Sequence, residues 1–520
     1  MIELQTKIHD SYSVEFKEGF VVPEEDQSQS QFTINTWLFV PSSLDLTAET
    51  YPKHLFWRDL KSQVRMITPV FTLHEMTKAG ALPVAYLSNA MNRMAADPSE
   101  ENVEEYVYQI KMFCAILKSA TREETHRICR IADGLARPGD READGAALEG
   151  FTGSSTAFAL DLGQILAVFH SLRQIVAAPA GGASDRSASG SQSTGNAVPG
   201  VSDRMREVYA YGDEFTGHIV SLYAYRIIER MEALAPKSDA CHLLKQLVND
   251  ISAHGREMGF ACPDSTRSRH NDMLIYRHGV LKKFIESELF VSLKKKKDGI
   301  AAEQTLYALA AGIAMIFATI VSFSVQRKFG SLSIPLFFAL IFSYMIKDRI
   351  KELSRYWFVH RLGKKYYDNK STVSVKGVPV GTIKEGVDFI DYAKVPGEVL
   401  KLRSLQSPMA VGNDVLDEKV ILYRKLVTID AQALHKSGTY DVKGINDICR
   451  LHLARFTQKM DNPDQTLMCL DENCSLKQVW GKKIYYLNIV LQMCSGDKTE
   501  YRRYRLNLTR DGIRNIEEIS

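Results

Sequence analysis

Two uncharged, strongly apolar runs constrain the fold of this chain most: Leu306–Val325 and Phe329–Ile346, separated by the polar turn 326–328. At about 1.5 Å per residue, helices over these runs are roughly 30 Å and 27 Å long, enough to cross the hydrocarbon core of a bilayer. A helix of a soluble domain rarely continues so far without a charge, because one flank usually meets water. We therefore expect a transmembrane helical hairpin over 304–347 rather than the buried centre of a soluble domain.

Basic residues flank the hairpin. Together with one tryptophan, they are expected to lie at the membrane surface and to contact anionic lipid headgroups. They are Lys294, Lys295, Lys296 and Lys297 before the first run, and Lys347, Arg349, Arg355 and Trp357 after the second. Because basic residues stay preferentially on the cytoplasmic side, we expect both termini to be cytoplasmic in an inner or plasma membrane. The N-terminal residues lack an apolar core after a basic start, so no cleaved signal peptide is expected.

Residues 348–370 are rich in basic and aromatic side chains and are expected to form a juxtamembrane helix. Such a helix suits the headgroup region if it lies along the membrane surface. It can equally be a cytoplasmic continuation of the second spanning helix. The composition leaves both interpretations open.

Small residues recur along one side of the first spanning segment, where they let helix backbones approach closely in lipid. They are Ala310, Ala314, Ala318 and Ser322 at every fourth position, with Ala308 and Gly312 beside them. The stripe predicts packing against the other helix of the hairpin or against a second protomer, which would make the chain a homo-oligomer. Neither run carries an ionisable residue in its interior, which disfavours an ion or proton relay there.

The composition excludes some function classes. The chain has 520 residues, which suggests three or four domains, and a formal net charge of only +3. Bulk charge therefore does not indicate a nucleic-acid partner, and none is expected. The eight cysteines are scattered through regions that we expect to be cytoplasmic, so a disulfide framework is not expected.

The rest of the chain predicts an α+β multidomain protein. Alternating β-branched and aromatic residues indicate a small N-terminal β-rich region over 1–56. Helical periodicity follows over 57–298, which we expect to be a cytoplasmic helical bundle. The Gly-, Ser- and Ala-rich segment 178–200 is expected to be a disordered linker within it. A cytoplasmic α+β domain with an antiparallel sheet is expected over 371–520.

Within the C-terminal domain, the strand predictions rest on β-branched and aromatic runs at 419–429, 466–470, 483–493 and 500–508. One helix is predicted between the first two of these strands. Its face is formed by Ile445, Ile448, Leu451, His452 and Phe456. Cys449 and His452 would share a side of that helix, although free buried cysteines explain this pattern better than a metal site.

No Walker-A, GxGxxG, GxSxG or HExxH motif occurs, which lowers the expectation of an enzyme without excluding it. The only catalytic candidates are carboxylate and histidine pairs at helical spacing. They are Glu123 with His126, Glu214 with His218, and Asp250 with His254. Surface ion pairs explain such spacing more simply than ligation, so we expect no metal and no cofactor.

These patterns together predict a membrane-anchored cytoplasmic binding, sensory or scaffold protein. A first alternative is a membrane-associated metal-dependent enzyme that uses the carboxylate and histidine pairs of the helical region. A second is an oligomeric membrane-perturbing or pore-forming effector that assembles through the first spanning helix.

Overall fold

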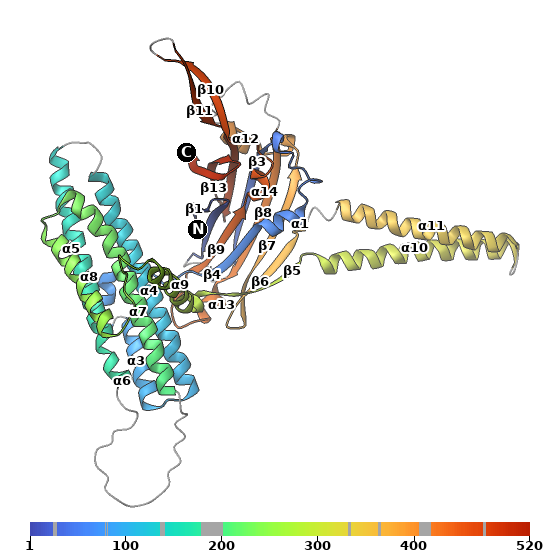
Figure 1. The fold of residues 1–520 in the computed structure, drawn as a ribbon. Coiled ribbons are helices and arrows are strands. Elements are labelled where there is room, and N and C mark those ends of the chain that lie inside the picture. The colour runs from blue at the N-terminus through green and yellow to red at the C-terminus, as the bar shows by residue number, and fades with distance from the viewer. Residues whose placement is uncertain are drawn as a thin grey trace, which may run out of the picture. The chain divides into compact units, whose positions relative to one another are not determined.

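The computed structural model describes residues 1–23, 29–78, 80, 82–135, 141–177, 201–330, 334–361, 366–404, 418–471 and 475–519 (Figure 1). The expected linker 178–200 lies outside these residues. The fold mixes helix and antiparallel sheet, with 54% of the chain helical and 30% in strands, so both elements shape it. The chain divides into a sheet unit, Met1–Ile67 with Val291–Ser520, and a helical unit, Thr68–Phe290.

The sheet unit contains a four-stranded and an eight-stranded sheet in which neighbouring strands are antiparallel. The smaller sheet has the order β1 (Ile2–Asp10), β2 (Ser13–Val21), β9 (Gly444–His452) and β4 (Leu60–Met66). The larger has the order β14 (Gly512–Ile519), β13 (Lys498–Thr509), β12 (Tyr485–Ser495), β3 (Gln29–Pro41), β8 (Glu418–Asp430), β7 (Val378–Ile390), β6 (Asn369–Val375) and β5 (Ser292–Lys297).

The hydrophobic core of this unit is built from strands that lie far apart in the sequence. In β8, side chains from Ile421 to Ile429 alternate between buried and half-buried, as the two-residue period of a strand requires. The buried hydrophobic ones, Ile421, Tyr423, Val427 and Ile429, join Phe16 of β2 and Leu451 of β9 in one cluster. The N-terminal strands are therefore part of the same unit as the C-terminal ones, whereas the sequence boundary at residue 56 placed them in a separate region.

The predicted helix through Ile445, Ile448 and Leu451 is wrong, because these residues lie in strand β9. Steps of three residues fit a helix face, but a short apolar run has the same spacing in a buried strand. Cys449 and His452 therefore do not share a helix face. Only α14 (Ala454–Thr457) is helical here, and β4 likewise interrupts the region predicted to be helical from residue 57.

Short elements connect the strands of the sheet unit. They are η1 (Ser42–Leu44), α1 (Lys53–Asp59), η4 (Tyr392–Lys394), α12 (Gly397–Ser404), α13 (Ala431–Lys436) and a two-stranded ribbon of β10 (Asp464–Leu470) and β11 (Leu476–Lys482).

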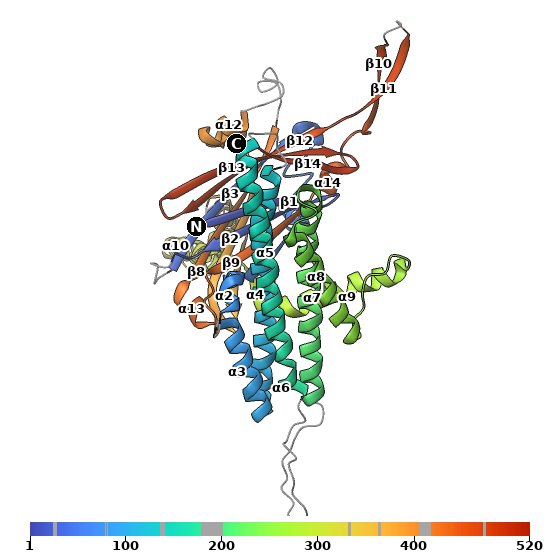
Figure 2. The same ribbon diagram turned by 90° about the vertical axis from the view of Figure 1, so that its left-hand side faces the viewer.

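In the helical unit, long helices lie side by side (Figure 2). The elements are α2 (Leu73–Thr77), α3 (Leu82–Ala96), α4 (Glu100–Leu135), α5 (Arg141–Ser171), α6 (Arg173–Ala177), α7 (Val201–Leu234), α8 (Asp239–Glu257), α9 (Ser268–Glu286) and η2 (Ser287–Leu289). The predicted face of α4 is buried, with Tyr106, Ile110 and Phe113 at most 1% exposed. Ser238 caps α8 by accepting a hydrogen bond from the backbone N–H of Cys241.

Helices α10 (Ile300–Phe329) and α11 (Ile334–Arg361) follow β5 and precede β6 in the sequence, and they lie side by side (Figure 1). Ala310 and Ala314 are buried, and the Ser343 hydroxyl of α11 donates to the Ala318 carbonyl at 3.3 Å. This part of the small-residue stripe therefore packs against the partner helix. Ala308 and Gly312 are exposed.

The expected juxtamembrane helix is not a separate element. Helix α11 runs without a break through residues 347–361, as the continuation alternative required. Arg355 of α11 stacks on the ring of Tyr307 in α10, with 4.5 Å between its guanidinium carbon and the ring centroid.

By length and composition, two helices in the described part of the chain could cross a membrane: Gly145–Ile175 and Glu303–Lys328. Of the apolar window in Gly145–Ile175, 44% is buried, and Phe158, Leu162 and Phe169 form part of the core of the helical unit. Only 11% of the window in Glu303–Lys328 is buried. Of the two, only Glu303–Lys328 presents a largely uncovered apolar surface.

Candidate ligand-binding cavity

A cavity of about 380 Å³ lies among α5, α7, α8 and α9 of the helical unit. Most of its wall is apolar. The apolar lining includes Leu166, Leu222, Ile251, Phe260, Leu274 and Ile275. Mainly apolar concave walls with a few convergent polar groups are typical of small-molecule sites.

Helix α7 places a carboxylate in the wall of this cavity. Tyr209, Asp213, Thr216 and Val220 follow one another at helical spacing and are all nearly inaccessible to solvent. Asp213 is the one charged member of this stripe and is only 2% exposed. A buried carboxylate requires hydrogen-bond partners, since an unpaired charge in a protein interior is costly.

Two histidines from other helices supply those partners. Nε2 of His170, on α5, lies 3.1 Å from Oδ1 of Asp213, and Nε2 of His254, on α8, lies 2.9 Å from Oδ2. The two imidazole rings stack with their centroids 3.9 Å apart. Burial acts to raise the pKa of Asp213, but the hydrogen bonds from His170 and His254 outweigh it and hold this pKa below its ordinary value.

A second histidine pair and an ion pair complete the polar groups of the wall. His218 of α7 stacks on His278 of α9 with ring centroids 3.5 Å apart. Burial, and then the neighbouring His278, lower the pKa of His218 to about 4, so this imidazole is neutral at pH 7. Glu214 is held by Arg277 through contacts of 2.5 Å and 2.6 Å.

The cavity thus offers neutral imidazole nitrogens and a buried carboxylate next to apolar walls. These groups can accept or donate hydrogen bonds to the polar end of a small apolar molecule, and His170, Asp213 and His254 have the donor types of a metal site.

The structure brings three of the six sequence candidates together: Glu214, His218 and His254 all line the cavity. Their partners differ from those that helical spacing predicted, because Glu214 pairs with Arg277 and His254 pairs with Asp213. Glu123, His126 and Asp250 are exposed and are not among its lining residues.

Sequence reasoning missed His170, Asp213 and His278. For Asp213 a signal exists, since it is a charged residue on the apolar stripe of α7. For the histidines there is no local signal, because their partners are on other helices.

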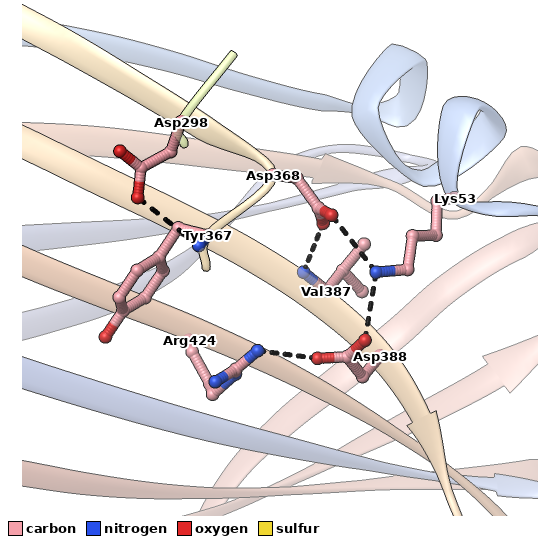
Figure 3. Close-up of polar contacts among 7 residues, drawn as sticks. All are labelled: Lys53, Asp298, Tyr367, Asp368, Val387, Asp388 and Arg424. Atoms are coloured by element: carbon pink, nitrogen blue, oxygen red, sulfur yellow. Dashed lines mark hydrogen bonds and ion pairs between the residues drawn. The ribbon is translucent and has the colours of Figure 1, made fainter. Parts of the chain in front are cut away.

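A second pocket, of about 440 Å³, lies at the base of the α10–α11 hairpin within the sheet unit. Figure 3 shows the polar network that borders it. The Lys53 ammonium contacts Asp368 at 3.1 Å and Asp388 at 2.9 Å, and Arg424 contacts Asp388 at 2.7 Å. Asp368 also accepts a hydrogen bond from the backbone N–H of Val387, so the network fixes the chain where it enters β6.

The other end of the hairpin is fixed in the same region. Asp298 accepts a hydrogen bond from the backbone N–H of Tyr367 at 3.4 Å (Figure 3). Lys297 contacts Glu303 at 2.8 Å. The four lysines expected at the membrane surface, Lys294–Lys297, form exposed β5 at the edge of the larger sheet, where charge also discourages pairing with other chains.

A third polar cluster is fully buried between the two sheets. Lys425 of β8 contacts Glu18 of β2 at 2.5 Å and Asp447 of β9 at 2.6 Å, and its ammonium lies 3.0 Å from the sulfur of Cys449. Burial raises the pKa of Glu18 to about 7. We assign this cluster to the core, since it adjoins only a space of about 30 Å³.

Comparisons of the chain with protein-family models, with curated proteins and with solved structures found no match.

Proposed function

We propose that this chain is a membrane-anchored binding protein, held in the bilayer by the α10–α11 hairpin and able to take a small, largely apolar ligand in the cavity of its helical unit. The apolar surface of the hairpin supports membrane anchoring. Its large apolar side chains face outward while Ala310 and Ala314 are buried between the helices, the reverse of a soluble helix pair. The outward residues are more than half exposed and include Leu309, Ile313, Ile316, Ile320, Phe323, Phe337, Phe338 and Phe342.

Water is an unfavourable surrounding for such a surface. Each large apolar side chain left in water forgoes about 1.5–3 kcal/mol relative to burial. Monomeric soluble proteins rarely expose apolar patches of this extent. The hydrocarbon chains of lipids can cover these apolar side chains and remove them from water without a protein partner.

The attachment of the hairpin supports a topology with both termini on one side. Its two ends join β5 and β6, which are paired directly, with Lys297 opposite Asn369. The basic side chains of Lys347, Arg349 and Arg355 lie between the middle of α11 and the end that joins these strands, which favours a cytoplasmic location of that end and contact with anionic headgroups. Trp357, which is half exposed, suits the interface as well.

The described apolar part of α11 is short. It extends from Ile334 to Ile346, about 20 Å at helical rise, before Lys347 begins the charged part. The contacts Ser343 with Ala318 and Arg355 with Tyr307 place the charged part of α11 alongside the first half of α10. A spanning hairpin therefore requires Lys347 and Arg349 to extend toward the headgroups.

The first experiment is alkaline extraction of isolated membranes. Wild-type protein should remain in the membrane pellet and require detergent for release. The matched control replaces residues 298–368 by Asn-Gly, because a two-residue turn connects paired antiparallel strands such as β5 and β6. This variant should be soluble and folded. Wild-type protein that dissolves without detergent would contradict the proposal.

The second experiment tests the topology with Arg327→Cys, at the exposed end of α10. A membrane-impermeant maleimide should label this cysteine in intact cells. Cys469, exposed on β10, is an internal control that should be labelled only after permeabilisation. If both cysteines need permeabilisation, the tip of the hairpin does not reach the far face of the bilayer, and the two-span topology is wrong.

The third experiment tests the ligand cavity by mass spectrometry of small molecules that co-purify with the protein. Ile275→Trp puts a larger side chain into the cavity lining and should reduce the amount of the bound molecule. Tyr276→Trp is the matched control, because Tyr276 is as exposed as Ile275 but does not line the cavity, and it should leave the amount unchanged. Equal amounts in both variants would argue against the cavity as the ligand site.

A further inference from the structure

We propose that His170, Asp213 and His254 form a binding site for one divalent first-row transition-metal ion in the wall of the cavity. Each residue offers one ligand atom, an imidazole nitrogen or a carboxylate oxygen, and the three atoms lie within 4.8 Å of one another. The inference goes beyond the proposed function and does not depend on membrane anchorage.

The spacing of the ligand atoms fits a single ion. Metal–ligand bonds of about 2.0–2.2 Å to imidazole nitrogen and carboxylate oxygen separate neighbouring ligand atoms by about 2.9–3.4 Å for right-angled to tetrahedral arrangements. The two nitrogen–oxygen separations in the structure are 2.9 Å and 3.1 Å. The two rings are stacked with an interplanar angle of 22°, so binding of an ion in the ring planes also requires at least one imidazole to turn out of the stack.

The charge of Asp213 favours a cation at this position. Its carboxylate is only 2% exposed, and a divalent cation held by it and by two imidazole nitrogens compensates the buried charge. Glu214 does not compete for the ion, because Arg277 holds both of its oxygens.

The donor types define the class of metal. Two imidazole nitrogens and one carboxylate suit Zn²⁺, Fe²⁺ or Co²⁺, whereas Ca²⁺ and Mg²⁺ prefer sites built from oxygen ligands. Three protein ligands leave at least one coordination position open. Since all three residues line the cavity, the polar end of a cavity ligand can occupy that position.

The site is supported from three separate helices. His170 is on α5, Asp213 on α7 and His254 on α8. Phe169, next to His170, stacks between Phe113 and Tyr209 at centroid distances of 5.3 Å and 5.1 Å. This aromatic stack fixes the turn of α5 that carries His170. Rigid neighbouring packing of this kind holds ligands in place before the ion binds.

The experiment uses the full chain in detergent, dialysed against a chelator and titrated with Co²⁺, whose absorption spectrum reports its ligands. We expect one ion per chain, displaced by Zn²⁺. His170→Ala and His254→Ala should each weaken binding by at least about 100-fold. Asp213→Asn, which keeps the side-chain volume, should also weaken it. His126→Ala, on the exposed face of α4, is the matched control that should retain the ion.

A second readout covers the case in which a variant folds poorly. Zn²⁺ should raise the Tm of the wild-type protein, because an ion that binds only the folded state stabilises it. The Tm of Asp213→Asn should not respond. The inference is overturned if wild-type protein binds no stoichiometric Co²⁺, or if the alanine variants of His170 and His254 bind it as tightly as wild type.

Discussion

Replacement of Lys425 by methionine tests the energetics of the buried cluster in the sheet unit. Lys425 is fully buried and contacts the carboxylates of Glu18 and Asp447 at 2.5 Å and 2.6 Å. Methionine has a similar volume but no charge, so the substitution leaves two carboxylates uncompensated between the sheets. Breaking a buried ion pair in this way costs about 3–5 kcal/mol. Since a domain is stable by only about 5–15 kcal/mol, the loss is a large part of the total.

Tryptophan fluorescence during urea unfolding of the full chain in detergent measures this loss. All four tryptophans, Trp37, Trp57, Trp357 and Trp480, belong to the sheet unit, so the signal does not report on the helical unit. The matched control adds Glu18→Gln and Asp447→Asn to Lys425→Met, which removes the uncompensated charges. This triple variant should recover most of the lost stability. A single variant within about 1 kcal/mol of wild type, or a triple variant less stable than the single one, would refute the reasoning.

Three further predictions concern single side chains. Glu18→Gln should remove a pH dependence of stability. Burial raises the pKa of Glu18 from 4.5 to about 7, so its contribution to the free energy of unfolding falls as the pH rises through that window. Urea titrations should show this fall only in wild type. Gly444→Ala should destabilise the sheet unit by at least about 1–3 kcal/mol in the same assay, because a Cβ there would lie 1.9 Å from the carbonyl oxygen of Phe20; an unchanged midpoint would contradict the observed register. Ala314→Leu should lower the Tm in detergent, since Ala314 is buried in the hairpin. Gly312→Leu should leave the Tm unchanged. If light scattering shows that Gly312→Leu alters the oligomeric state, the side of α10 that carries Gly312 contacts a second protomer.

The structure contains the helices and strands that strong local sequence patterns predict. The strand at 419–429 is rich in β-branched and aromatic residues, and the helix after Asp97 has several turns of periodic apolar residues. Residue type identifies the strand and a period of 3.6 over many residues identifies the helix. The segment 445–456 is apolar at positions that fit both a helix face and a buried strand, which explains why its sequence predicts a helix.

Tertiary pairing was not predictable in this way. Spacing along one helix suggested Asp250 as the partner of His254, but Asp213 on a different helix contacts it. The pairing of Ser13 with His452 across the sheet has no local signal either. Half of the cavity candidates were found because histidine and acidic residues on a helix are easy to locate. Their partners depend on how the helices pack.

The order of the strands in the smaller sheet has a consequence for synthesis of the chain. Strand β2 lies between β1 and β9, and its register pairs Ser13 with His452, 439 residues later. At about 5–20 residues per second, a ribosome needs roughly 20–90 s to make the intervening chain. The helical unit is contiguous in the sequence and the hairpin precedes β9, so both can fold before β9 is synthesised and pairs with β2. The sheet unit is therefore the last part to close, and the nascent N-terminus must stay soluble until then.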